Sequence, residues 1–341
     1  METNPWSWYT DPEILRLEQE RIFRRSWHYA GHTGQVARSG DRFACRAGDV
    51  PVLVVRDGAD LRAFLNVCRH RGSVLVEGEA AGATIQCRYH AWTYGLDGSL
   101  RRAPRAEREP AFDADGLGLC PVQVATWGPF VFANPDLDGP PLDAALGDLP
   151  ALVTEAGLDL DAVRFRERVH YELAANWKIA AENYLECYHC PVAHKRFSAV
   201  VDVSPDAYRL EGRDGLWSQY CVGRSGGEHG QFHLLWPGFK LNVFPGCTNV
   251  SVGPLWPEGP ERTGGFLDYF FGDEVAEEDV RNLLALDDQV GREDRALVEA
   301  VQRGVRSGLL EAGRLMPESE WLVAGFQQRV AAVLGSVTRN A

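Results

Sequence analysis

The chain lacks the features of a secreted, membrane-spanning or nucleic-acid-binding protein. No basic segment followed by an apolar core opens the 341 residues, so we expect no signal peptide. The longest run without charged residues, 116–135, includes Gly128 and Pro129 and alternates in the manner of a β-strand, which argues against a spanning helix. The formal net charge of −13 argues against nucleic acid or an anionic membrane as a partner. We therefore expect a soluble, cytoplasmic protein.

The chain also has no internal repeat, no low-complexity segment and no disulfide framework of the kind found in small secreted domains. Its eight cysteines are unevenly spread, and in a cytoplasmic setting such cysteines bind metals or are buried more often than they form bridges. Hydrophobic residues make up 45% and charged residues 24%, which is ordinary globular usage. The length allows one large or two ordinary domains with a substantial core.

The pattern of the first half changes near residue 40. Residues 12–27 have the apolar spacing of an amphipathic helix, with Asp11 as its cap and Pro12 in its first turn. From 40 to 134, short β-rich runs are separated by Gly and Asp turns, which predicts a small antiparallel sandwich or barrel. Residues 136–150, rich in Pro, Gly and Asp, are typical of a linker.

The second half mixes strand and helix patterns. Its expected elements are a strand at 163–173, a helix from 176, a β-rich stretch from 216 to 271, and helices at 277–309 and 318–334. We therefore predict an α+β fold. A small antiparallel β domain at 40–150 is embedded in a larger domain at 151–341, whose antiparallel sheet is flanked by helices. The N-terminal segment 1–39 is expected to pack on the larger domain.

Two cysteines and two histidines in the β-rich part form the first candidate metal site. They are arranged as Cys68-x-His70 and Cys87-x₂-His90. Two thiolates and two imidazoles suit either a tetrahedral zinc or a [2Fe–2S] centre in which histidines ligate one iron. Zinc fingers usually place both cysteines before both histidines, whereas here each loop offers one of each. The pattern favours the Rieske arrangement, in which each loop gives its cysteine to one iron and its histidine to the other.

A later stretch, predicted to begin as a helix, carries the second candidate site. It presents Glu186, His189 and His194, side chains of the types that a divalent iron or zinc takes as ligands. Glu186 and His189 are three apart and share a face on a helix. His189 and His194 are five apart and would lie about 140° apart on a regular helix. Pro191 should bend or end the helix, which would bring the two histidines to one metal.

Four motifs spread along the chain carry a family resemblance. They are Asn66-Val-Cys68-Arg-His70-Arg-Gly72, Cys87-Arg-Tyr-His90-Ala-Trp92-Thr-Tyr94-Gly95, Asn176-Trp177-Lys178 and Glu186-x₂-His189-x₄-His194. With them the sequence resembles, over nearly its whole length, the α subunits of Rieske-type non-haem iron ring-hydroxylating oxygenases. The resemblance implies a cluster on Cys68, His70, Cys87 and His90, and a mononuclear iron on His189 and His194. A two-histidine, one-carboxylate iron keeps positions open for O₂, and a Rieske cluster supplies electrons singly.

The third ligand of the mononuclear iron must come from another part of the chain. The helical segment 286–304, in which Glu293-Asp294 is followed by a Gln-x-Gly ending, resembles the third-ligand helix of the family. We expect Asp294 to be the ligand, with Asp288 as the second choice.

Three positions depart from the family pattern. Arg88 and Ala91 stand where the family often has Pro and Gly in the second cluster loop, both of which are positions that shape the backbone. Glu186 stands where many members carry Asp as the bridge between metal centres. In family members electrons cross from the cluster of one subunit to the iron of the next, which implies a ring-shaped homotrimer. Glu186 would then touch His90 of one subunit and His189 of its own.

Cys187 and Cys190 form a Cys-x₂-Cys pair inside the iron motif. Such a pair can carry redox chemistry. Because it lies among the expected iron ligands, we interpret it as packing.

An aromatic-rich stretch between Trp217 and Trp256 is expected to line the substrate pocket. The candidates are Trp217, Phe232, His233, Asn242 and Phe244. Aromatic side chains can hold a quaternary ammonium by cation–π attraction, and they can equally sandwich an aromatic ring. The segment 183–191 resembles the branch that acts on carnitine-, choline- and betaine-like compounds, and the chain is shorter than the large dioxygenases.

We therefore predict an oxidoreductase that uses O₂ to hydroxylate or N-dealkylate a small organic substrate, with a quaternary ammonium or N-methyl compound as the favoured class. An aromatic-acid ring-hydroxylating dioxygenase is the alternative, and a Rieske electron-transfer protein without catalytic iron is the alternative from another class. The expected cofactors are a [2Fe–2S] Rieske cluster and mononuclear Fe(II), with NAD(P)H acting only through a flavin or iron–sulfur reductase or a ferredoxin. The sequence leaves open the substrate, the regiochemistry and the identity of the reductase.

Overall fold

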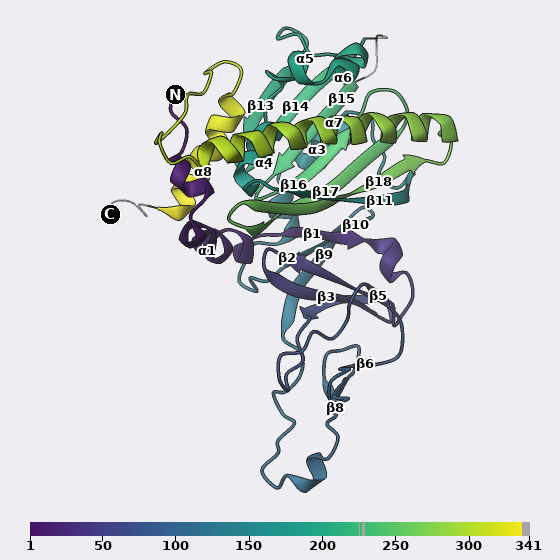
Figure 1. Ribbon diagram of the computed structural model, residues 1–341. Helices are drawn as coiled ribbons and strands as arrows, with labels where there is room; N and C mark the ends of the chain where they lie inside the picture. The colour runs from purple at the N-terminus through teal and green to yellow at the C-terminus, as the bar shows by residue number, and fades with distance from the viewer. Residues whose placement is uncertain (225, 227–228, 336–341) are drawn as a thin grey trace. The chain divides into compact units, whose positions relative to one another are not determined.

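Antiparallel sheets and helices make up the part of the chain that the computed structural model describes, residues 1–224, 226 and 229–335. Each strand pairing found there is antiparallel, and helices flank the largest sheet (Figure 1). The predicted α+β class is therefore confirmed. No helix in these ranges is long and apolar enough to cross a membrane.

The contacts within the chain separate two units. Their limits are Phe23–Ala145 for the smaller unit, and Met1–Ile22 with Leu146–Ala341 for the larger. The N-terminal segment 1–39, which we expected to pack on the larger domain as a whole, is thus divided. The cause is the strand β1 (His28–His32), which joins the sheet of the smaller unit. The last six residues of the predicted 151–341 domain lie outside the described residues.

The smaller unit contains a seven-stranded sheet in the order β1-β10-β9-β4-β3-β2-β5 and a three-stranded sheet β6-β7-β8. The strands after β1 are β2 (Arg42–Ala47), β3 (Val50–Asp57), β4 (Asp60–Leu65), β5 (Glu79–Ala80), β6 (Ile85–Gln86), β7 (Thr93–Tyr94), β8 (Leu100–Arg102), β9 (Pro121–Trp127) and β10 (Phe130–Asn134). Short helical turns are η2 (Phe23–Arg25), η3 (Thr33–Val36) and η4 (Ala106–Arg108), and the last residue of helix α2 (Leu142–Leu146) already belongs to the larger unit.

Strand β3 supplies apolar side chains to both faces of its sheet. Leu53 and Val55 pack in one hydrophobic cluster, and Val52 and Val54 pack in another. Successive side chains of a strand point to opposite faces, so a run of four apolar residues fills two cores at once. This explains why the segment has no polar alternation in its sequence.

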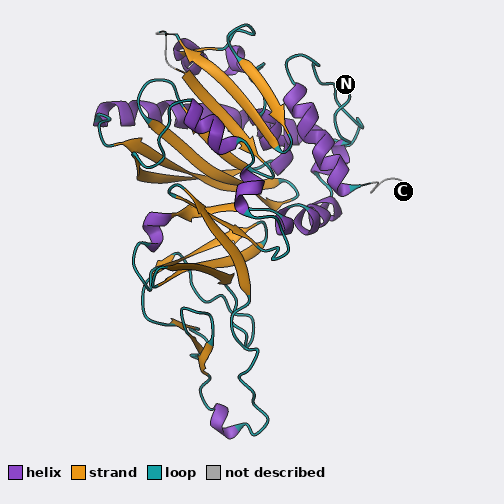
Figure 2. Ribbon diagram, turned by 180° about the vertical axis from the view of Figure 1, so that it is seen from behind, coloured by secondary structure: helices purple, strands orange, loops and turns teal. Residues whose placement is uncertain are grey.

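The larger unit is built on an eight-stranded sheet in the order β11-β18-β17-β16-β15-β14-β12, with β13 paired to β14. Its strands are β11 (Val163–Leu173), β12 (Val201–Asp202), β13 (Arg209–Arg213), β14 (Leu216–Gly223), β15 (His229–Leu235), β16 (Phe239–Val243), β17 (Asn249–Gly259) and β18 (Arg262–Gly272). Its helices are η1 (Trp6–Tyr9), α1 (Pro12–Arg21), α3 (Leu149–Glu155), α4 (Trp177–Tyr184), α5 (Cys190–Ala193), α6 (Lys195–Val200), α7 (Glu277–Val305) and α8 (Trp321–Leu334). Helix α7 lies across one face of this sheet, in front of it in Figure 1 and behind it in Figure 2.

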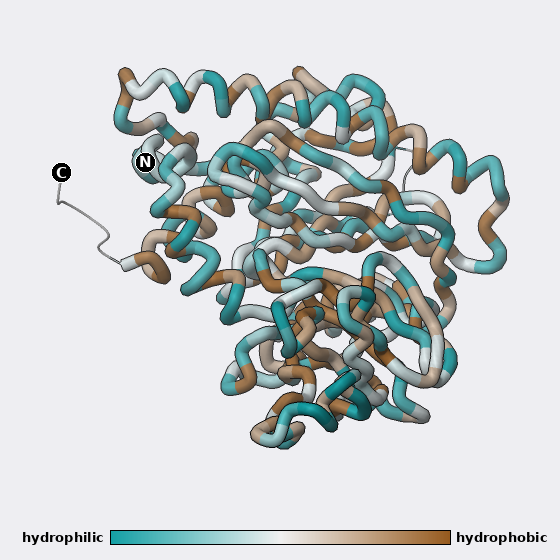
Figure 3. Tube along the Cα trace, turned by 60° about the horizontal axis from the view of Figure 1, so that its bottom comes forward, coloured by the Kyte–Doolittle hydropathy of each residue, from teal (hydrophilic) through white to brown (hydrophobic). Residues whose placement is uncertain are grey.

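The long helix α7 turns one narrow apolar stripe inward. Val280, Leu283, Val298 and Val305 are buried, and the residues between them are mostly polar and exposed. Figure 3 shows the same interleaving of hydrophobic and hydrophilic residues along much of the chain. A helix with this pattern stays on the surface with one face against the core, so its inner face can carry functional side chains over the sheet.

The Asn176-Trp177-Lys178 motif fixes the start of α4. The Asn176 side chain accepts a hydrogen bond from the Lys178 backbone at 2.9 Å and so caps the helix. Trp177 Nε1 and Lys178 Nζ donate to the two carboxylate oxygens of Glu18 at 2.7 and 2.6 Å. The Glu18 and Lys178 side chains are fully buried. This pairing ties α1 to α4 across the larger unit.

Candidate iron centre and its cavity

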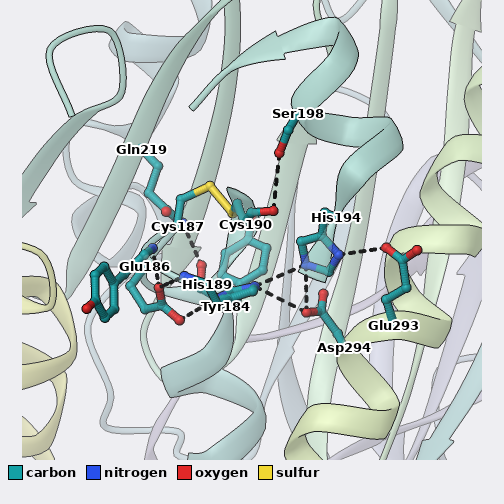
Figure 4. Close-up of polar contacts among 11 residues, drawn as sticks. Tyr184, Glu186, Cys187, His189, Cys190, His194, Ser198, Gln219, Glu293 and Asp294 are labelled. Atoms are coloured by element: carbon teal, nitrogen blue, oxygen red, sulfur yellow. Dashed lines mark hydrogen bonds and ion pairs between the residues drawn. A yellow bond between two sulfur atoms is a disulfide. The ribbon is translucent and has the colours of Figure 1, made fainter. Parts of the chain in front are cut away.

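Three side chains of the larger unit converge on one point (Figure 4). His189 Nε2 lies 3.0 Å from His194 Nε2, and Asp294 Oδ1 lies 3.0 Å from His194 Nε2 and 3.4 Å from His189 Nε2. Two imidazole nitrogens and one carboxylate oxygen at such spacing suit a divalent metal with bonds of about 2.1 Å. Two histidines with one carboxylate is the donor set of mononuclear iron sites that keep open positions.

The two histidines meet because the backbone leaves the helix earlier than the sequence predicted. We expected the helix to bend or end near Cys190, but α4 ends at Tyr184. Pro191 instead lies in the first turn of the next short helix, α5. The N–H groups of a first turn have no partner within the helix, so a proline there costs no hydrogen bond. His194 is the residue between α5 and α6.

Glu186 is held against His189 by the turn between α4 and α5, and not by a shared helix face as the sequence predicted. Its Oε2 accepts hydrogen bonds from the backbone N–H groups of Tyr188 and His189, and its Oε1 accepts from His189 Nδ1. A proton held at Nδ1 leaves the Nε2 lone pair of the same ring free for a metal. Glu186 therefore orients the first histidine.

Glu293 does the same for the second histidine. Its Oε2 accepts from His194 Nδ1 at 2.8 Å, and its Oε1 accepts from Gln289 Nε2 at 2.8 Å. Sequence reasoning named Glu293 among the acids of this helix but missed this role. The signal was its place beside Asp294, which allows the two residues to reach opposite nitrogens of one ring. Asp288 instead pairs with Arg292 at 3.0 Å on an exposed part of the helix, although it also borders the cavity described below.

The carboxylates of the site favour protonated imidazoles as long as no metal cation replaces the protons. Burial lowers the pKa of His189, but hydrogen bonds to Asp294 and Glu186 outweigh it and raise that pKa to about 9. The pKa of His194 is also raised, since Asp294 and Glu293 outweigh burial. Burial raises the pKa of Asp294, yet the two histidines bring it down to about 2. A metal ion would replace these protons as the positive charge among the ligands.

Cys187 and Cys190 form a disulfide, which corrects the expectation from composition that bridging is disfavoured. The short turn brings their Cα atoms to 4.9 Å, within the range that a disulfide requires. Both residues are also buried in a hydrophobic cluster that includes Phe197 and Phe232. The predicted packing role is therefore accompanied by a covalent bond.

A cavity of about 250 Å³ adjoins the three converging side chains. One face of the sheet, together with α4, α5, α6 and α7, forms its walls. Aromatic side chains are prominent in its lining, and the cavity also has one lysine, Lys240, on its wall. The aromatic residues are Tyr171, Tyr184, Phe197, Tyr208, Phe232, Phe244 and Tyr269.

Of the five predicted pocket residues, Phe232, Asn242 and Phe244 line this cavity, and Trp217 and His233 do not. His233 follows Phe232 on β15, so its side chain points to the opposite face of the sheet, where it bonds Ser218 and Gln231. Trp217 packs against Phe326 of α8, with ring centroids 5.5 Å apart. Alternation along β15 explains His233, whereas Trp217 lies on the same face of the sheet as Gln219, which lines the cavity, but packs against α8 instead.

In the smaller unit, two loops bring together the four predicted cluster residues. Cys68 and Cys87 are buried, whereas His70 and His90 are exposed with ring centroids 4.7 Å apart. Within the described residues, the only group of three or more such side chains whose ligand atoms lie within 4.8 Å of one another is His189, His194 and Asp294. Buried thiols with exposed imidazoles suit a two-iron cluster that has its thiolates inside and its imidazoles outside.

Hydrogen bonds fix both loops. The Asn66 side chain accepts from the backbone of Leu75 and Val76, which closes the first loop. In the second loop the Cys87 backbone donates to Trp92 at 2.8 Å, and Ala91 adopts a left-handed φ of +57°. Such a φ favours glycine, which explains why the family often has Gly at this position.

The two thiols differ in their surroundings. Burial raises the pKa of Cys87, but hydrogen bonds from the Tyr89 backbone, the Cys68 thiol and the His90 backbone outweigh it, so this pKa lies below its ordinary value. Tyr94 Oη lies 3.3 Å from Cys68 Sγ and accepts from the Arg69 backbone at 3.0 Å. The Arg69 N–H occupies one lone pair of the Tyr94 oxygen, and the hydroxyl can still donate its proton to the sulfur.

Comparison with known proteins agrees with this chemistry over almost the whole chain. The family descriptions "Rieske [2Fe-2S] domain" and "Ring hydroxylating alpha subunit (catalytic domain)" match residues 26–125 and residues 160–231 and 223–336, respectively. The carnitine monooxygenase oxygenase subunit of Escherichia coli (strain K12) is 35% identical over 332 residues, which cover 93% of this chain and 88% of that protein. The chloroplastic choline monooxygenase of Amaranthus tricolor is 33% identical over 334 residues, covering 92% of this chain and 74% of that protein.

Solved structures show the same relationship. The quaternary ammonium Rieske monooxygenase CntA in complex with γ-butyrobetaine superposes with a TM-score of 0.88 at 31% identity, covering 98% of this chain and 96% of that one. Naphthalene 1,2-dioxygenase, with a TM-score of 0.81 at 20% identity, shares the fold. The chain therefore belongs to the Rieske non-haem iron oxygenases, the family of the ring-hydroxylating α subunits.

Proposed function

We propose that the chain is the terminal oxygenase of a monooxygenase that acts on a small quaternary ammonium compound with O₂ and electrons from a reductase. The observation that carries the proposal is the convergence of His189, His194 and Asp294 at the wall of an aromatic-lined cavity. An electron carrier without a catalytic iron would have no use for such a site beside a cavity.

The size and lining of the cavity support a small cationic substrate. A volume of about 250 Å³ is below that of pockets for drug-sized ligands, which start near 300 Å³. Methyl groups on a quaternary nitrogen cannot donate ordinary hydrogen bonds, so aromatic faces are a suitable surface for this cation. The names of the relatives, carnitine and choline monooxygenases, support the same class. The aromatic-acid alternative is supported only by the fold of the dioxygenase relative.

The residues of this chain would perform four tasks. His189, His194 and Asp294 would hold the mononuclear iron, which supplies O₂ chemistry when bound. Glu186 and Glu293 hold protons at the Nδ1 atoms of the two histidines and so aim each Nε2 at the metal. The buried aromatic wall excludes water from the substrate beside that point. Cys68, His70, Cys87 and His90 would hold the cluster that supplies electrons singly.

The partners and assembly belong to the same proposal. The electrons would come from NAD(P)H through a flavin or iron–sulfur reductase or a ferredoxin. A homotrimer, with Glu186 as the bridge between His90 of one subunit and His189 of its own, is expected from the family resemblance. A solved structure of a quaternary ammonium Rieske monooxygenase, 31% identical to this chain, is described as giving insight into inter-subunit electron transfer in that protein, which supports this expectation. We also propose that the protein is cytoplasmic.

Oxygen consumption tests the proposed reaction. The protein with both metal centres loaded is mixed with a generic iron–sulfur reductase and NADH, and O₂ uptake is recorded with γ-butyrobetaine, L-carnitine, choline or benzoate. We expect uptake that depends on at least one quaternary ammonium compound, with an oxygenated or dealkylated product in mass spectrometry. Uptake with benzoate alone would overturn the substrate class.

Iron analysis tests the metal content independently of any substrate. We expect one iron per chain beyond the two that belong to the cluster. A preparation that folds, shows the full cluster spectrum and cannot be loaded beyond the two cluster irons would support the electron carrier instead.

A further inference from the structure

Lys240 places a cation on the wall of the cavity. It lies on β16, a central strand, between Leu234 of β15 and Gly253 of β17. Lys240 and Asn242 point to the same face of the sheet, and both line the cavity. The other two lysines of the chain are not part of this wall, since Lys178 pairs with Glu18 and Lys195 is exposed.

The ammonium group of Lys240 has aromatic neighbours but no ion-pair partner among the described residues. Its Nζ lies 4.5 Å from the ring centroid of Tyr171 and 5.8 Å from that of Tyr184. In the described part of the chain no carboxylate lies within ion-pair distance of it. Asp287 is close enough to feel its charge, but that carboxylate accepts a hydrogen bond from Tyr269 at 2.6 Å. A half-buried cation without a partner favours an anion brought by a ligand.

The opposite end of the same wall suits a cation. Phe244 follows Lys240 by four residues, or roughly 13 Å along the strand direction. The rings of Phe197, Phe232 and Phe244 pack edge to face, and Phe197 lies 6.5 Å from the ring of His194. This aromatic end of the cavity therefore adjoins the converging histidines.

Gln219 adds negative polarity to that end. It lies opposite Phe232 on the neighbouring strand and lines the cavity. Its Nε2 donates to the Tyr184 carbonyl, whereas its buried Oε1 has no hydrogen-bond partner within the described residues. An amide oxygen in this situation attracts the positive methyl groups of a quaternary ammonium.

We propose that Lys240 binds the carboxylate of a zwitterionic substrate whose quaternary ammonium lies against Phe197, Phe232 and Phe244. The cavity would then select trimethylammonium carboxylates over choline, which has a hydroxyl group in place of the carboxylate. This inference rests on the proposed function and specifies the substrate class within it. Lys240 is a specificity-determining residue in this account, because it touches the end of the substrate that does not react.

Paired substrates and three variants test the assignment. Specificity constants are measured with γ-butyrobetaine and choline for the wild type, Lys240→Met, Lys240→Arg and Arg295→Met. Lys240→Met removes the charge at similar length, and Lys240→Arg keeps it. Arg295→Met is the matched control, because Arg295 is the other cation on the cavity lining without an ion-pair partner among the described residues, and it is exposed.

We expect the wild type to prefer γ-butyrobetaine. Lys240→Met should reduce the ratio of the two specificity constants by about tenfold to a hundredfold, which is the range for losing a hydrogen bond to a charged group. Lys240→Arg should recover most of the ratio, and Arg295→Met should leave it as in the wild type. Calorimetric binding of γ-butyrobetaine should weaken in parallel in Lys240→Met, and circular dichroism shows whether that variant is folded.

The outcomes separate this inference from the proposed function. Turnover of choline and γ-butyrobetaine with a ratio that Lys240→Met does not change would overturn the role of Lys240 and leave the monooxygenase proposal standing. A loss confined to Arg295→Met would assign the carboxylate to that residue instead. If the loaded wild type oxidises and binds no quaternary ammonium compound, both proposals fail. If Lys240→Met does not fold, Lys240→Gln takes its place, and a ratio that Lys240→Gln leaves as in the wild type would overturn the inference.

Discussion

Glu293 and Asp294, consecutive residues of α7, contact opposite nitrogens of the His194 ring. Glu293 Oε2 lies 2.8 Å from Nδ1, and Asp294 Oδ1 lies 3.0 Å from Nε2. A single turn of helix therefore supplies both an oxygen that faces the Nε2 atom of His194 and the acceptor that fixes the tautomer of the same ring. Each of these two acids gives a different prediction.

Glu293→Ala should weaken the binding of mononuclear iron without removing the site. Loss of the acceptor frees the His194 ring to rotate or to change tautomer, and outer-shell changes of this kind cost about tenfold to a hundredfold in metal affinity. Anaerobic titration with Fe(II) measures the effect. Glu278→Ala, at an exposed position at the start of the same helix, is the control. Equal affinities in the two variants would contradict the orienting role.

Asp294→Ala should abolish the mononuclear iron and leave the cluster spectrum intact, whereas Asp288→Ala should keep both. The reason is geometric, because Asp294 Oδ1 is within 3.4 Å of both histidine nitrogens and Asp288 pairs with Arg292. Iron content per chain and the visible absorption of the cluster are measured on the same samples. Loss of the extra iron in Asp288→Ala alone would make Asp288 the third ligand.

Glu186→Gln should separate the charge of this residue from its hydrogen bonds. The amide oxygen can still accept from the Tyr188 and His189 N–H groups, so we expect both metal centres to load. Turnover should nevertheless fall by about a hundredfold, since the carboxylate that orients His189 and is proposed to link the centres is gone. Glu186→Ala should also retain both metals at saturating Fe(II), although with weaker iron binding as in Glu293→Ala, and lose almost all activity. Full turnover in either variant would remove the proposed bridge.

Tyr94→Phe should lower the reduction potential of the cluster by tens of millivolts. The hydroxyl lies 3.3 Å from Cys68 Sγ, and hydrogen bonds to cluster sulfurs stabilise the reduced, more negative state. A spectroscopic redox titration measures the midpoint, and the phenyl ring preserves the packing of the loop. Trp92→Phe, a change of the ring that stacks on His70, provides a comparison without loss of a bond to sulfur. An unchanged midpoint in Tyr94→Phe would show that the hydroxyl does not contact the sulfur.

His233 should make the larger unit sensitive to acid. Burial lowers its pKa to about 4, whereas the unfolded value is about 6.5. Between pH 4 and pH 6.5, His233 is protonated in the unfolded chain and neutral in the folded chain. The free energy of unfolding therefore falls as the pH falls from 6.5 towards 4. The loss reaches about 2 kcal/mol by pH 5. Urea unfolding of the wild type and His233→Gln at pH 7 and pH 5 should show a smaller loss in the variant, and parallel losses would contradict this account.

The candidate ligands could be named from the sequence because metal chemistry restricts both residue type and spacing. Cys68-x-His70 and Cys87-x₂-His90 allow few alternatives, and the histidines five apart around a proline point to a broken helix. The end of α4 was misplaced because Pro191 was taken as a breaker, and it instead starts the following helix. A proline has either role depending on whether the preceding turn is already unwound, and sequence spacing does not reveal that.

Contacts between residues far apart in the sequence could not be predicted, for a different reason. Nothing in the sequence around Glu293 tells that His194 will lie beside it, since the two residues are 99 apart and meet only when α7 packs over the sheet. The disulfide of Cys187 and Cys190 was likewise hidden, because it depends on the turn that the backbone takes after Tyr184. The pocket prediction failed at His233 because the sequence does not tell which residues of β15 face the cavity.

The buried pair of Glu18 and Lys178 has a consequence for biosynthesis. The two residues are 160 apart in sequence, and the whole smaller unit lies between them. At about 5–20 residues per second, a ribosome needs roughly ten to thirty seconds to deliver the lysine after the glutamate. The nascent chain therefore carries its first helix with an unmatched acid while the intervening unit is made. The first twenty-two residues can therefore pack in the larger unit only after the chain beyond Leu146 has been synthesised.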